Sequence, residues 1–582
     1  MPAPCARGNR TGNAMRTPQQ IESMFPVSDR SAQRFPRLNA LQLETVRRFG
    51  RETEHSFAPD ELLFDVGESG VPAWFLIEGT ATMFGRDGFD QESQLRALES
   101  GQFTGELHQL ASRPTLTGTR AGPDGCRALP LYSADLRALI VGSADLGEMV
   151  MRAFILRRVG LLEAGVGPVL LGRAGSAPLV RLQGFLSRSA YPHLAIDCSS
   201  DRGRQLIADL ALPAEDLPLL ICPCGRLLKH PSNEEAAAWL GINPALPADV
   251  VYDVAVVGAG PAGLATAVYA ASEGLSVLVL DREAVGGQAG ASARIENYLG
   301  FPTGISGVAL TGRALNQAQK FGAEVAIPVA ASELAVRSLA SRPDATLQLT
   351  LSESQRVRAR TVVIASGAKY KRPGIANLRD FEGAGVHYWA SPVESKLCAG
   401  EDVVLVGAGN SAGQAAVFLA PHVKRLYLMV RGAGLEASMS RYLIQRIAAL
   451  DNVDIHVRHE LAELHGTRLG GLEGATFTDR ESGAMRHFPV RHVFMFIGAE
   501  PNTGWLNSCV ALDDKGYVVT GAAALAGDEP TVALPLETSL PRVFAIGDVR
   551  SGSTKRVASA VGEGAAVVAQ IHSVLGGVRT NA

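Results

Sequence analysis

The stretch DVAVVGAGPAGLATAVYAASEGLSVLVLD, residues 253–281, decides the fold that we expect for the largest part of this chain. An apolar run leads into Gly258-x-Gly260-x-x-Gly263, a helix of small residues follows, and Asp281 closes the next apolar run. The glycines allow a tight turn and a close approach of the backbone to a diphosphate at the amino end of the helix. The terminal acid can hold a ribose diol. The stretch therefore predicts a dinucleotide-binding α/β unit.

A second glycine loop repeats this pattern later in the chain. VVLVGAGNSAGQAAV, residues 403–417, follows an apolar strand pattern, and its Gly407 corresponds to Gly258 of the first loop. Alanine takes the place of the third glycine, which the dinucleotide-binding fingerprint allows. The internal repeat predicts two nucleotide-binding units in one chain.

Length, composition and charge narrow the class of protein. A chain of 582 residues is too long for one hydrophobic core and predicts several domains. With 46% hydrophobic residues, 19% charged residues and 62 glycines, it has the composition of a soluble α/β protein. The net charge of -3 argues against nucleic-acid binding. Neither a secretory signal nor a long apolar run is evident, so we expect a cytoplasmic protein that does not bind a membrane.

The seven cysteines are few, odd in number and scattered along the chain. A secreted disulfide framework is therefore not expected, and no metal site is predicted.

The segment before the first glycine loop divides into three parts. We expect a flexible tail over 1–30, a small β-barrel with a carboxyl-terminal helix over 31–163, and a compact α/β domain with alternating strands and helices over 166–245.

Four further segments accompany the two glycine loops in a characteristic order. They are VGGQAGASARIENYLGFP (285–302), VVIASGAKY (362–370), FMFIGAEPNTGWL (494–506) and VFAIGDVRSGSTKRVASAVGEG (543–564). Together the six motifs resemble the thioredoxin reductase branch of the flavin-dependent pyridine nucleotide disulfide oxidoreductases. The resemblance implies a homodimer and a Rossmann-like FAD domain, 250–370 and 491–582, which is split by a Rossmann-like NAD(P) domain, 371–490.

The resemblance also implies the cofactor sites. The residues expected to bind FAD are Gly258, Gly260, Gly263, Asp281, Gly287, Gln288, Asn297, Gly547, Asp548, Lys555, Arg556 and Val557. Those expected to bind the nicotinamide nucleotide are Gly407, Gly409, Asn410, Ser411, Ala412 and Arg431. No acid closes the strand before Arg431, which favours NADPH over NADH, although Glu436 stands where the family has a further arginine. NADH stays open.

The family's redox disulfide is missing from its usual place. Reductases of this type carry a Cys-x-x-Cys pair just before the second glycine loop, whereas this chain has Trp389-Ala390-Ser391-Pro392 there. None of these side chains can accept two electrons as a thiol pair does. Cys398 is nearby, either as an ordinary buried thiol or as an electron acceptor. Cys222 and Cys224 are the other candidate redox pair, although a metal role or a purely structural role stays open for them.

The two domains before residue 250 carry resemblances of their own. The element order of 166–245 resembles a thioredoxin-like fold, with Pro218 at the place of its often cis proline, but Ala174 to Pro178 stand where that fold carries its redox cysteines. GQFTGEL, residues 101–107, with the strand FLIEGTATMF, resembles a cyclic nucleotide-binding cassette. In this cassette, which includes Gly105, Glu106 would bind the ribose 2'-hydroxyl, but Thr115 replaces the arginine that binds the phosphate. We therefore expect the fold without cyclic nucleotide binding, and binding through Arg113 is the alternative.

These observations lead to one main hypothesis and two alternatives. The chain is expected to be a multidomain FAD-dependent NAD(P)H oxidoreductase, thioredoxin reductase-like but without the usual thiol pair. One alternative is a flavoprotein that reduces a one-electron protein of the ferredoxin kind or a quinone-type molecule. The other is a redox or nucleotide sensor with a regulatory amino-terminal module. The electron acceptor is open in all three.

Overall fold

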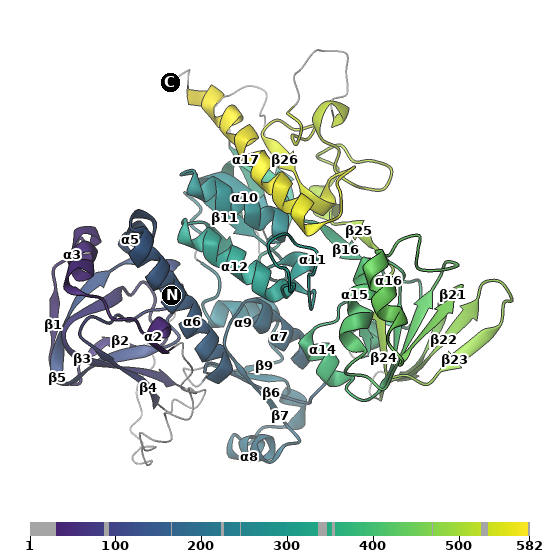
Figure 1. Cartoon of the computed structure of the whole chain (residues 1–582), viewed down its shortest axis with the longest axis horizontal. Coiled ribbons are helices and arrows are strands. Elements are labelled where there is room, and N and C mark those ends of the chain that lie inside the picture. The colour runs from purple at the N-terminus through teal and green to yellow at the C-terminus, as the bar shows by residue number, and fades with distance from the viewer. Residues whose placement is uncertain are drawn as a thin grey trace. The chain divides into compact units, whose positions relative to one another are not determined.

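The computed structural model describes residues 31–86, 92–164, 166–222, 226–244, 246–335, 346–351, 355–383, 385–467, 470–524 and 534–579. The chain divides into two compact units (Figure 1). The first lies within residues 1–166, and the second contains residues 167–582 together with the short segment 108–114. The tail expected over 1–30 lies outside the described residues.

The amino-terminal unit is an antiparallel sheet with flanking helices. Its strands pair in the order β1-β5-β3-β4, and β2 also pairs with β5. Phe64, Phe75, Phe84, Phe103 and Phe154 are fully buried and form the centre of its core. Its elements are α2 (Ser31–Arg34), α3 (Ala40–Phe49), β1 (His55–Phe57), β2 (Leu62–Phe64), β3 (Ala73–Arg86), β4 (Glu92–Glu99), β5 (Gly118–Leu131), α5 (Ser133–Gly142) and α6 (Ala144–Ala164), whereas α4 (Leu107–Leu110) lies mostly in the segment 108–114 of the second unit. Closure of this sheet into a barrel stays a prediction.

The second unit begins with a four-stranded mixed sheet in the order β7-β6-β8-β9. Strands β6 and β7 are parallel, whereas β8 runs antiparallel to β6 and to β9. The bond between Leu217 and Pro218 is cis. The elements are β6 (Val169–Gly172), α7 (Ala177–Arg188), β7 (Leu194–Asp197), α8 (Asp201–Asp209), β8 (Leu219–Ile221), β9 (Leu227–Lys229) and α9 (Asn233–Trp239). The sequence predicted the alternation through α9 but missed β9, because three residues are too few for a period-two pattern to be recognised.

The first glycine loop belongs to a mainly parallel sheet in the order β12-β11-β10-β15-β14-β13, with β26 beside β15. Strand β10 lies between β11 and β15, and four consecutive buried residues end it, as expected for a central parallel strand. The elements are β10 (Val251–Val257), α10 (Pro261–Ser272), β11 (Val277–Leu280), α11 (Gly287–Gly290), α12 (Gly307–Lys320), β12 (Glu324–Ala326), β13 (Ala331–Ala335), β14 (Leu347–Leu351), β15 (Arg356–Ile364), β26 (Val543–Ala545) and α17 (Val557–Arg579).

A second parallel sheet, in the order β17-β24-β18-β19-β20, is inserted between β15 and β26 of the first. It carries the second glycine loop, and a three-stranded antiparallel sheet β21-β22-β23 follows β20 along the chain. The two-stranded pair β16 (Ala368–Tyr370) and β25 (Ala499–Pro501) occurs where the chain enters and leaves the insertion. The other elements are α13 (Leu378–Phe381), β17 (Val386–His387), α14 (Pro392–Leu397), β18 (Asp402–Val406), α15 (Asn410–Leu419), β19 (Arg425–Val430), α16 (Arg441–Ala448), β20 (Val453–Val457), β21 (His459–Thr467), β22 (Gly471–Asp479), β23 (Met485–Phe488) and β24 (His492–Met495).

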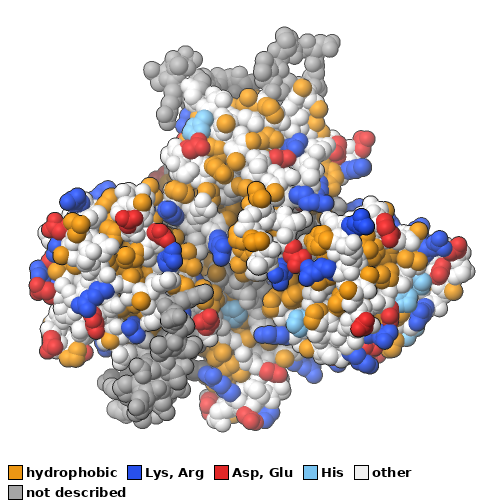
Figure 2. Space-filling view, in the orientation of Figure 1, with side chains coloured by type: hydrophobic (Ala, Val, Ile, Leu, Met, Phe, Trp, Pro, Cys, Tyr) orange, Lys and Arg blue, Asp and Glu red, His pale blue; other side chains and the backbone are white. Residues whose placement is uncertain are grey.

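Helix α17 is the one helix in the described part of the chain that is long and apolar enough to cross a membrane, over Val557–Gly576. This test considers length and composition only. The helix packs against α10, since a Cβ added at Gly564 would lie 2.4 Å from the carbonyl oxygen of Ala262. Val567, Val568 and Ile571 of this helix are buried. On the face seen in Figure 2, basic and acidic side chains are intermixed, in keeping with the small net charge.

Candidate functional site

The first glycine loop has the geometry that a diphosphate cradle needs. Gly258 has φ +120°, and a Cβ there would lie 2.1 Å from the carbonyl oxygen of Ala365. A Cβ at Gly263 would lie 1.9 Å from the carbonyl oxygen of Gly258. Gly260 caps the amino end of α10, and no atom lies within 4 Å of the Cβ position there. The first and third glycines are thus required by packing, whereas the second leaves space for a ligand at the helix terminus.

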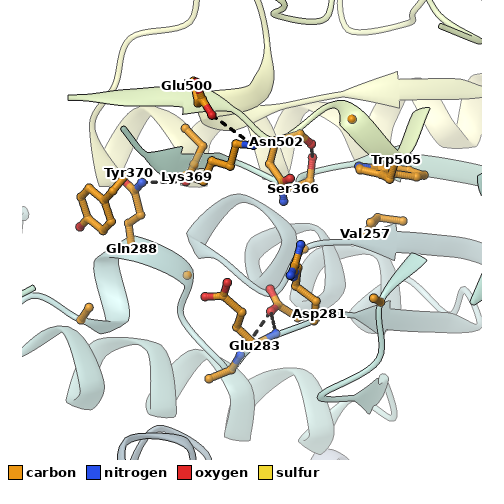
Figure 3. Close-up of a pocket in the computed structure, with 18 of the residues that line it drawn as sticks. Val257, Asp281, Glu283, Gln288, Ser366, Lys369, Tyr370, Glu500, Asn502 and Trp505 are labelled. Carbon is orange, nitrogen blue, oxygen red and sulfur yellow. Dashed lines mark hydrogen bonds and ion pairs between the residues drawn. The ribbon is translucent and has the colours of Figure 1, made fainter. Parts of the chain in front are cut away.

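A cavity of about 920 Å³ adjoins this loop (Figure 3). Gly258, Asp281, Gly287 and Gln288 of the predicted FAD site line it. From other segments it is lined by Arg188, Ser366, Tyr370, Tyr388, Trp389, Asn502 and Trp505. The volume lies within the range of small-molecule and cofactor sites.

Asp281 holds the loop in place as well as lining the cavity. Its Oδ2 accepts a hydrogen bond from the backbone N–H of Ala259 at 2.8 Å, and its Oδ1 accepts one from Glu283 at 2.8 Å. Burial raises the pKa of Asp281, and these hydrogen bonds oppose the rise. Oδ1 also accepts from the backbone N–H of Ala284 at 3.3 Å, so one acceptor site, on Oδ2, is left for a ribose hydroxyl, because each carboxylate oxygen can accept two hydrogen bonds.

The predicted FAD segment that contains Gly547 and Asp548 lies against the first turn of α10. A Cβ at Gly547 would be 2.9 Å from the Cβ of Ala262, and the N–H of Gly547 donates to Glu563 Oε2 at 2.6 Å. Burial raises the pKa of Asp548, whereas the charge of Lys555 lowers it. The Nζ of Lys555 donates to the carbonyl oxygen of Asp548 at 2.8 Å. Arg556 lies directly before α17, which begins at Val557, so the predicted segment is assembled at one helix terminus.

Asn297 does not line the same cavity as Gln288. Gln288 donates from Nε2 to the carbonyl oxygen of Ala368 at 2.7 Å, within the large cavity. Asn297 lines a smaller hollow together with Glu296 and Tyr442. The expected flavin-side role of Asn297 therefore stays a prediction that this arrangement does not support.

Aromatic side chains occupy the place of the missing thiols. Tyr388 and Trp389 line the large cavity, and Trp389 is 39% exposed. The indole Nε1 of Trp389 donates to Glu394 Oε1 at 2.9 Å, and Ser391 caps α14. The rings of Tyr370 and Tyr388 are stacked at 6.3 Å between centroids. This part of the cavity is thus an aromatic surface rather than a thiol site.

The candidate cysteines have different environments. Cys398 is fully buried, and burial raises its pKa to about 11. Its Sγ lies 3.8 Å from the carbonyl oxygen of Ser395. A reactive thiol needs a low pKa and some exposure, so Cys398 has the features of a structural thiol. Cys222 is buried directly after β8, and Cys224 lies outside the described residues, so the pairing of these two stays a prediction.

The second glycine loop repeats the geometry of the first. Gly407 has φ +148°, and a Cβ there would lie 2.5 Å from the carbonyl oxygen of Phe496. Gly409 caps α15, whose first turn contains Ser411 and Ala412, and no atom lies within 4 Å of the Cβ position at Gly409. Asn410 Oδ1 accepts a hydrogen bond from the N–H of Ser440 at 2.7 Å. Arg431 is exposed directly after β19, and its role in nucleotide binding stays a prediction.

The predicted cyclic nucleotide cassette is engaged in contacts within its own unit. Glu106 is buried and forms an ion pair with Arg158 of α6, with 2.6 Å between Oε2 and Nη2. The carbonyl oxygen of Gly105 accepts a hydrogen bond from Arg157 Nη1 at 2.8 Å. Thr115 donates from Oγ1 to the carbonyl oxygen of Asp65 at 2.8 Å. Each predicted cassette residue therefore has a partner inside the protein.

Arg188 is a cavity residue that could not be found from the sequence. It is the last residue of α7, more than sixty residues before the first glycine loop, and no motif includes it. Only tertiary structure brings it to the cavity. The contact is a hydrogen bond from its Nη2 to the carbonyl oxygen of Gly287 at 2.9 Å.

Comparisons with known proteins agree with this architecture for the carboxyl-terminal half. The family model of the pyridine nucleotide-disulphide oxidoreductases matches residues 252–564. The thioredoxin reductase of Bacillus subtilis (strain 168) is 30% identical over 316 residues, which are 54% of this chain and 92% of that protein. The thioredoxin reductase of Listeria monocytogenes is 30% identical over 314 residues, 54% of this chain and 91% of that protein. The solved Lactococcus lactis thioredoxin reductase shares the fold with a TM-score of 0.50 and 22% identity, covering 56% of this chain and 98% of that chain.

Proposed function

This chain belongs to the pyridine nucleotide-disulphide oxidoreductase family through residues 252–564, and from that premise we propose that it is an FAD-dependent NADPH oxidoreductase without relay thiols. Electrons would leave the flavin site directly for an acceptor that enters the cavity. The observation that carries this proposal is that Trp389 lines the same cavity as Gly258 and Asp281, at the place where the resembled reductases have their thiol pair.

The residues at the first glycine loop fit FAD. Open space above Gly260 adjoins a helix terminus, and Asp281 has acceptor capacity at the cavity wall. FAD, when bound, supplies the chemistry of taking a hydride from a reduced nicotinamide and passing the electrons on. The chain's part is to hold the diphosphate at the amino end of α10 and to exclude solvent with Tyr370 and Trp505.

The second glycine loop is the proposed NADPH site. The amino end of α15 faces open space at Gly409, which suits a second diphosphate. Arg431 would hold the 2'-phosphate that distinguishes NADPH from NADH, because it is a permanent cation at the end of β19. NADH would therefore bind more weakly than NADPH.

The aromatic surface favours a small planar oxidant of the quinone type as the acceptor. Tyr370 and Tyr388 are stacked beside Trp389, and an aromatic acceptor gains both buried area and ring contacts there. A redox protein of the ferredoxin kind offers no such ring, and a disulfide substrate needs a thiol pair that this surface lacks. The experiments below would detect reduction of either of these two other acceptors.

Anaerobic titration with NADPH tests the absence of relay thiols. We expect the FAD-loaded protein to accept two electrons per flavin, with the same number of free thiols before and after reduction. Uptake of four electrons with two new thiols would instead place a redox-active cysteine pair in the chain. Cys398→Ser and Cys222→Ser would then locate that pair.

Steady-state assays identify the acceptor class. We expect NADPH-dependent reduction of 1,4-naphthoquinone, and no reduction of oxidised thioredoxin. Trp389→Leu should raise KM for the quinone while leaving reduction of the bound flavin by NADPH unchanged. Trp239→Leu is the matched control, because Trp239 is 41% exposed on α9 and does not line the cavity. Thioredoxin turnover, or equal effects of the two substitutions, would contradict the proposed acceptor.

A further inference from the structure

Arg188 reaches the candidate FAD cavity from a part of the chain that the family match does not include. It ends helix α7 of the domain over 166–245, whereas the match begins at residue 252. Its Nη2 donates to the carbonyl oxygen of Gly287 at 2.9 Å, and the residue lines the cavity. A cation from the preceding domain is thus built into the wall of this cavity.

The hydrogen bond to Gly287 places the guanidinium beside the first glycine loop. A Cβ added at Gly287 would lie 3.2 Å from the Cα of Gly260, the residue that caps α10. The neighbouring N–H of Gly286 donates to the carbonyl oxygen of Ala259 at 2.8 Å. The loop that holds Arg188 therefore packs directly on the loop where a diphosphate would lie.

One donor of Arg188 is left over in this arrangement. The Nε is buried and has no hydrogen-bond partner among the described residues. A buried donor without an acceptor is costly, and more so for a charged group. The residue as a whole is only part-buried and lines the cavity, so an anionic ligand there can accept hydrogen bonds from its guanidinium, whose geometry phosphate oxygens match.

The positive charge of Arg188 affects the pKa values of two other residues that line the cavity. Burial raises the pKa of Asp281, and the charge of Arg188 is among the effects that oppose this rise. Burial also raises the pKa of Tyr370 to about 12, and Arg188 again acts in the opposite direction. The guanidinium therefore acts on both walls of the cavity, between which a dinucleotide would lie.

We propose that Arg188 binds the diphosphate of FAD, so that the domain over 166–245 completes the flavin site. This inference rests on the proposed function, because it assumes that FAD is the ligand of the first glycine loop. The domain would then have a direct part in cofactor retention although its thioredoxin-like redox position carries no cysteine. Flavin binding would depend on this domain staying in contact with Gly287.

Binding measurements on the full-length protein, freed of flavin, test the proposal. Arg188→Ala should weaken FAD binding roughly tenfold to 100-fold, the effect expected for one charge-assisted hydrogen bond. ADP should be weakened to a similar extent, whereas adenosine, which lacks the diphosphate, should bind the variant and the parent protein equally. Arg202→Ala is the control, because Arg202 is an exposed arginine of α8 in the same domain and does not line the cavity.

The outcomes separate this inference from the proposed function. If the parent protein does not bind FAD, the proposed function fails. If it binds FAD and Arg188→Ala binds FAD and ADP as tightly, only the inference is overturned, and equal losses for ADP and adenosine overturn it too, since they indicate a structural role. If Arg188→Ala does not fold, Arg188→Gln decides the matter, because it retains a polar N–H donor and much of the side-chain volume but removes the charge, and we expect the same selective loss.

Discussion

Arg158 and Glu106 form an ion pair inside the amino-terminal unit, with 2.6 Å between Nη2 and Oε2. Their side chains are only 8% and 2% exposed. In the cyclic nucleotide-binding cassette that this segment resembles, the acid at position 106 would meet a ribose hydroxyl. Here an arginine from α6 holds that acid, which bears directly on whether this unit has a ligand.

We expect the unit not to bind cyclic nucleotides. Thr115 stands in for the phosphate-binding arginine and already donates to Asp65, so no cation is provided for the cyclic phosphate. Calorimetry with cyclic AMP and cyclic GMP should show no binding tighter than about 10 μM, since a charge-assisted contact is missing. A lower Kd for either nucleotide would contradict this, and Arg113→Ala would then test whether Arg113 supplies the cation.

The same ion pair should stabilise the unit only while both partners are present. Removing one partner leaves a buried charge, so Glu106→Gln and Arg158→Met should each lower the free energy of unfolding by roughly 3 to 5 kcal/mol. The double substitution should cost clearly less than the sum of the two. Urea denaturation of the four proteins measures this coupling, and strictly additive losses would show that the pair does not interact.

The sequence predicted the two glycine loops because their chemistry is local. Gly258 and Gly407 need positive φ and close packing, and those demands appear in the residues themselves. The position of Arg188 was not predictable, since no spacing rule links the end of α7 to Gly287. Neither was the pairing of Glu106 with Arg158, which are fifty-two residues apart and meet only in the folded unit.

The site prediction was least secure for Asn297, whose environment depends on tertiary contacts. The placement of Asn297 in a different hollow from Gln288 depends on how the segment 291–306 folds back, which includes the bridge between Ile295 and Ile305. Such a bridge is a tertiary contact without a periodic signal. In contrast, the loss of the thiols at 389–392 could be read directly from the sequence, and the structure adds that aromatic side chains line the cavity there.

Arg431 should determine the choice of nicotinamide nucleotide. Arg431→Ala should raise KM for NADPH about tenfold or more, because it removes the one cation directly after β19, and leave KM for NADH unchanged. Arg425→Ala, at the other end of the same strand, is the control, since Arg425 is paired with Asp454. Equal effects on NADPH and NADH would show that Arg431 does not contact the 2'-phosphate.

His387 should make the folded state sensitive to acid. Burial, together with the charge of the neighbouring His492, lowers the pKa of this histidine to about 3. Unfolded histidine has a pKa near 6.5, so the unfolded state takes up the proton first, and stability falls as the pH drops from about 6.5 toward 3 by up to about 1.4 kcal/mol per pH unit.

The substitution His387→Phe tests this source of acid sensitivity. Phenylalanine keeps a ring against Phe494, on which His387 stacks at 4.9 Å, but cannot take up a proton. The difference in Tm between pH 7.5 and pH 5 should be smaller in the variant than in the parent protein. His422→Phe is the control, because His422 has an exposed ring at the end of α15. An unchanged difference in His387→Phe would assign the acid sensitivity to other groups.

Restoring cysteines at 389 and 392 should restore a relay. Trp389 lines the cavity and Pro392 begins α14, so the double substitution Trp389→Cys and Pro392→Cys places two thiols at the cavity wall and at the amino end of a helix. A helix amino terminus lowers a thiol pKa, and a Cys-x-x-Cys spacing permits a disulfide.

We expect the FAD-loaded double variant to accept four electrons from NADPH and to form two new thiols. The parent protein should accept two electrons and form no new thiols. Trp389→Ser with Pro392→Ser is the matched control and should accept two electrons and form no new thiols, as the parent protein does. A double variant that forms the disulfide but still accepts only two electrons would show that this position lies out of reach of the flavin, and the proposed exit at Trp389 would have to move elsewhere in the cavity.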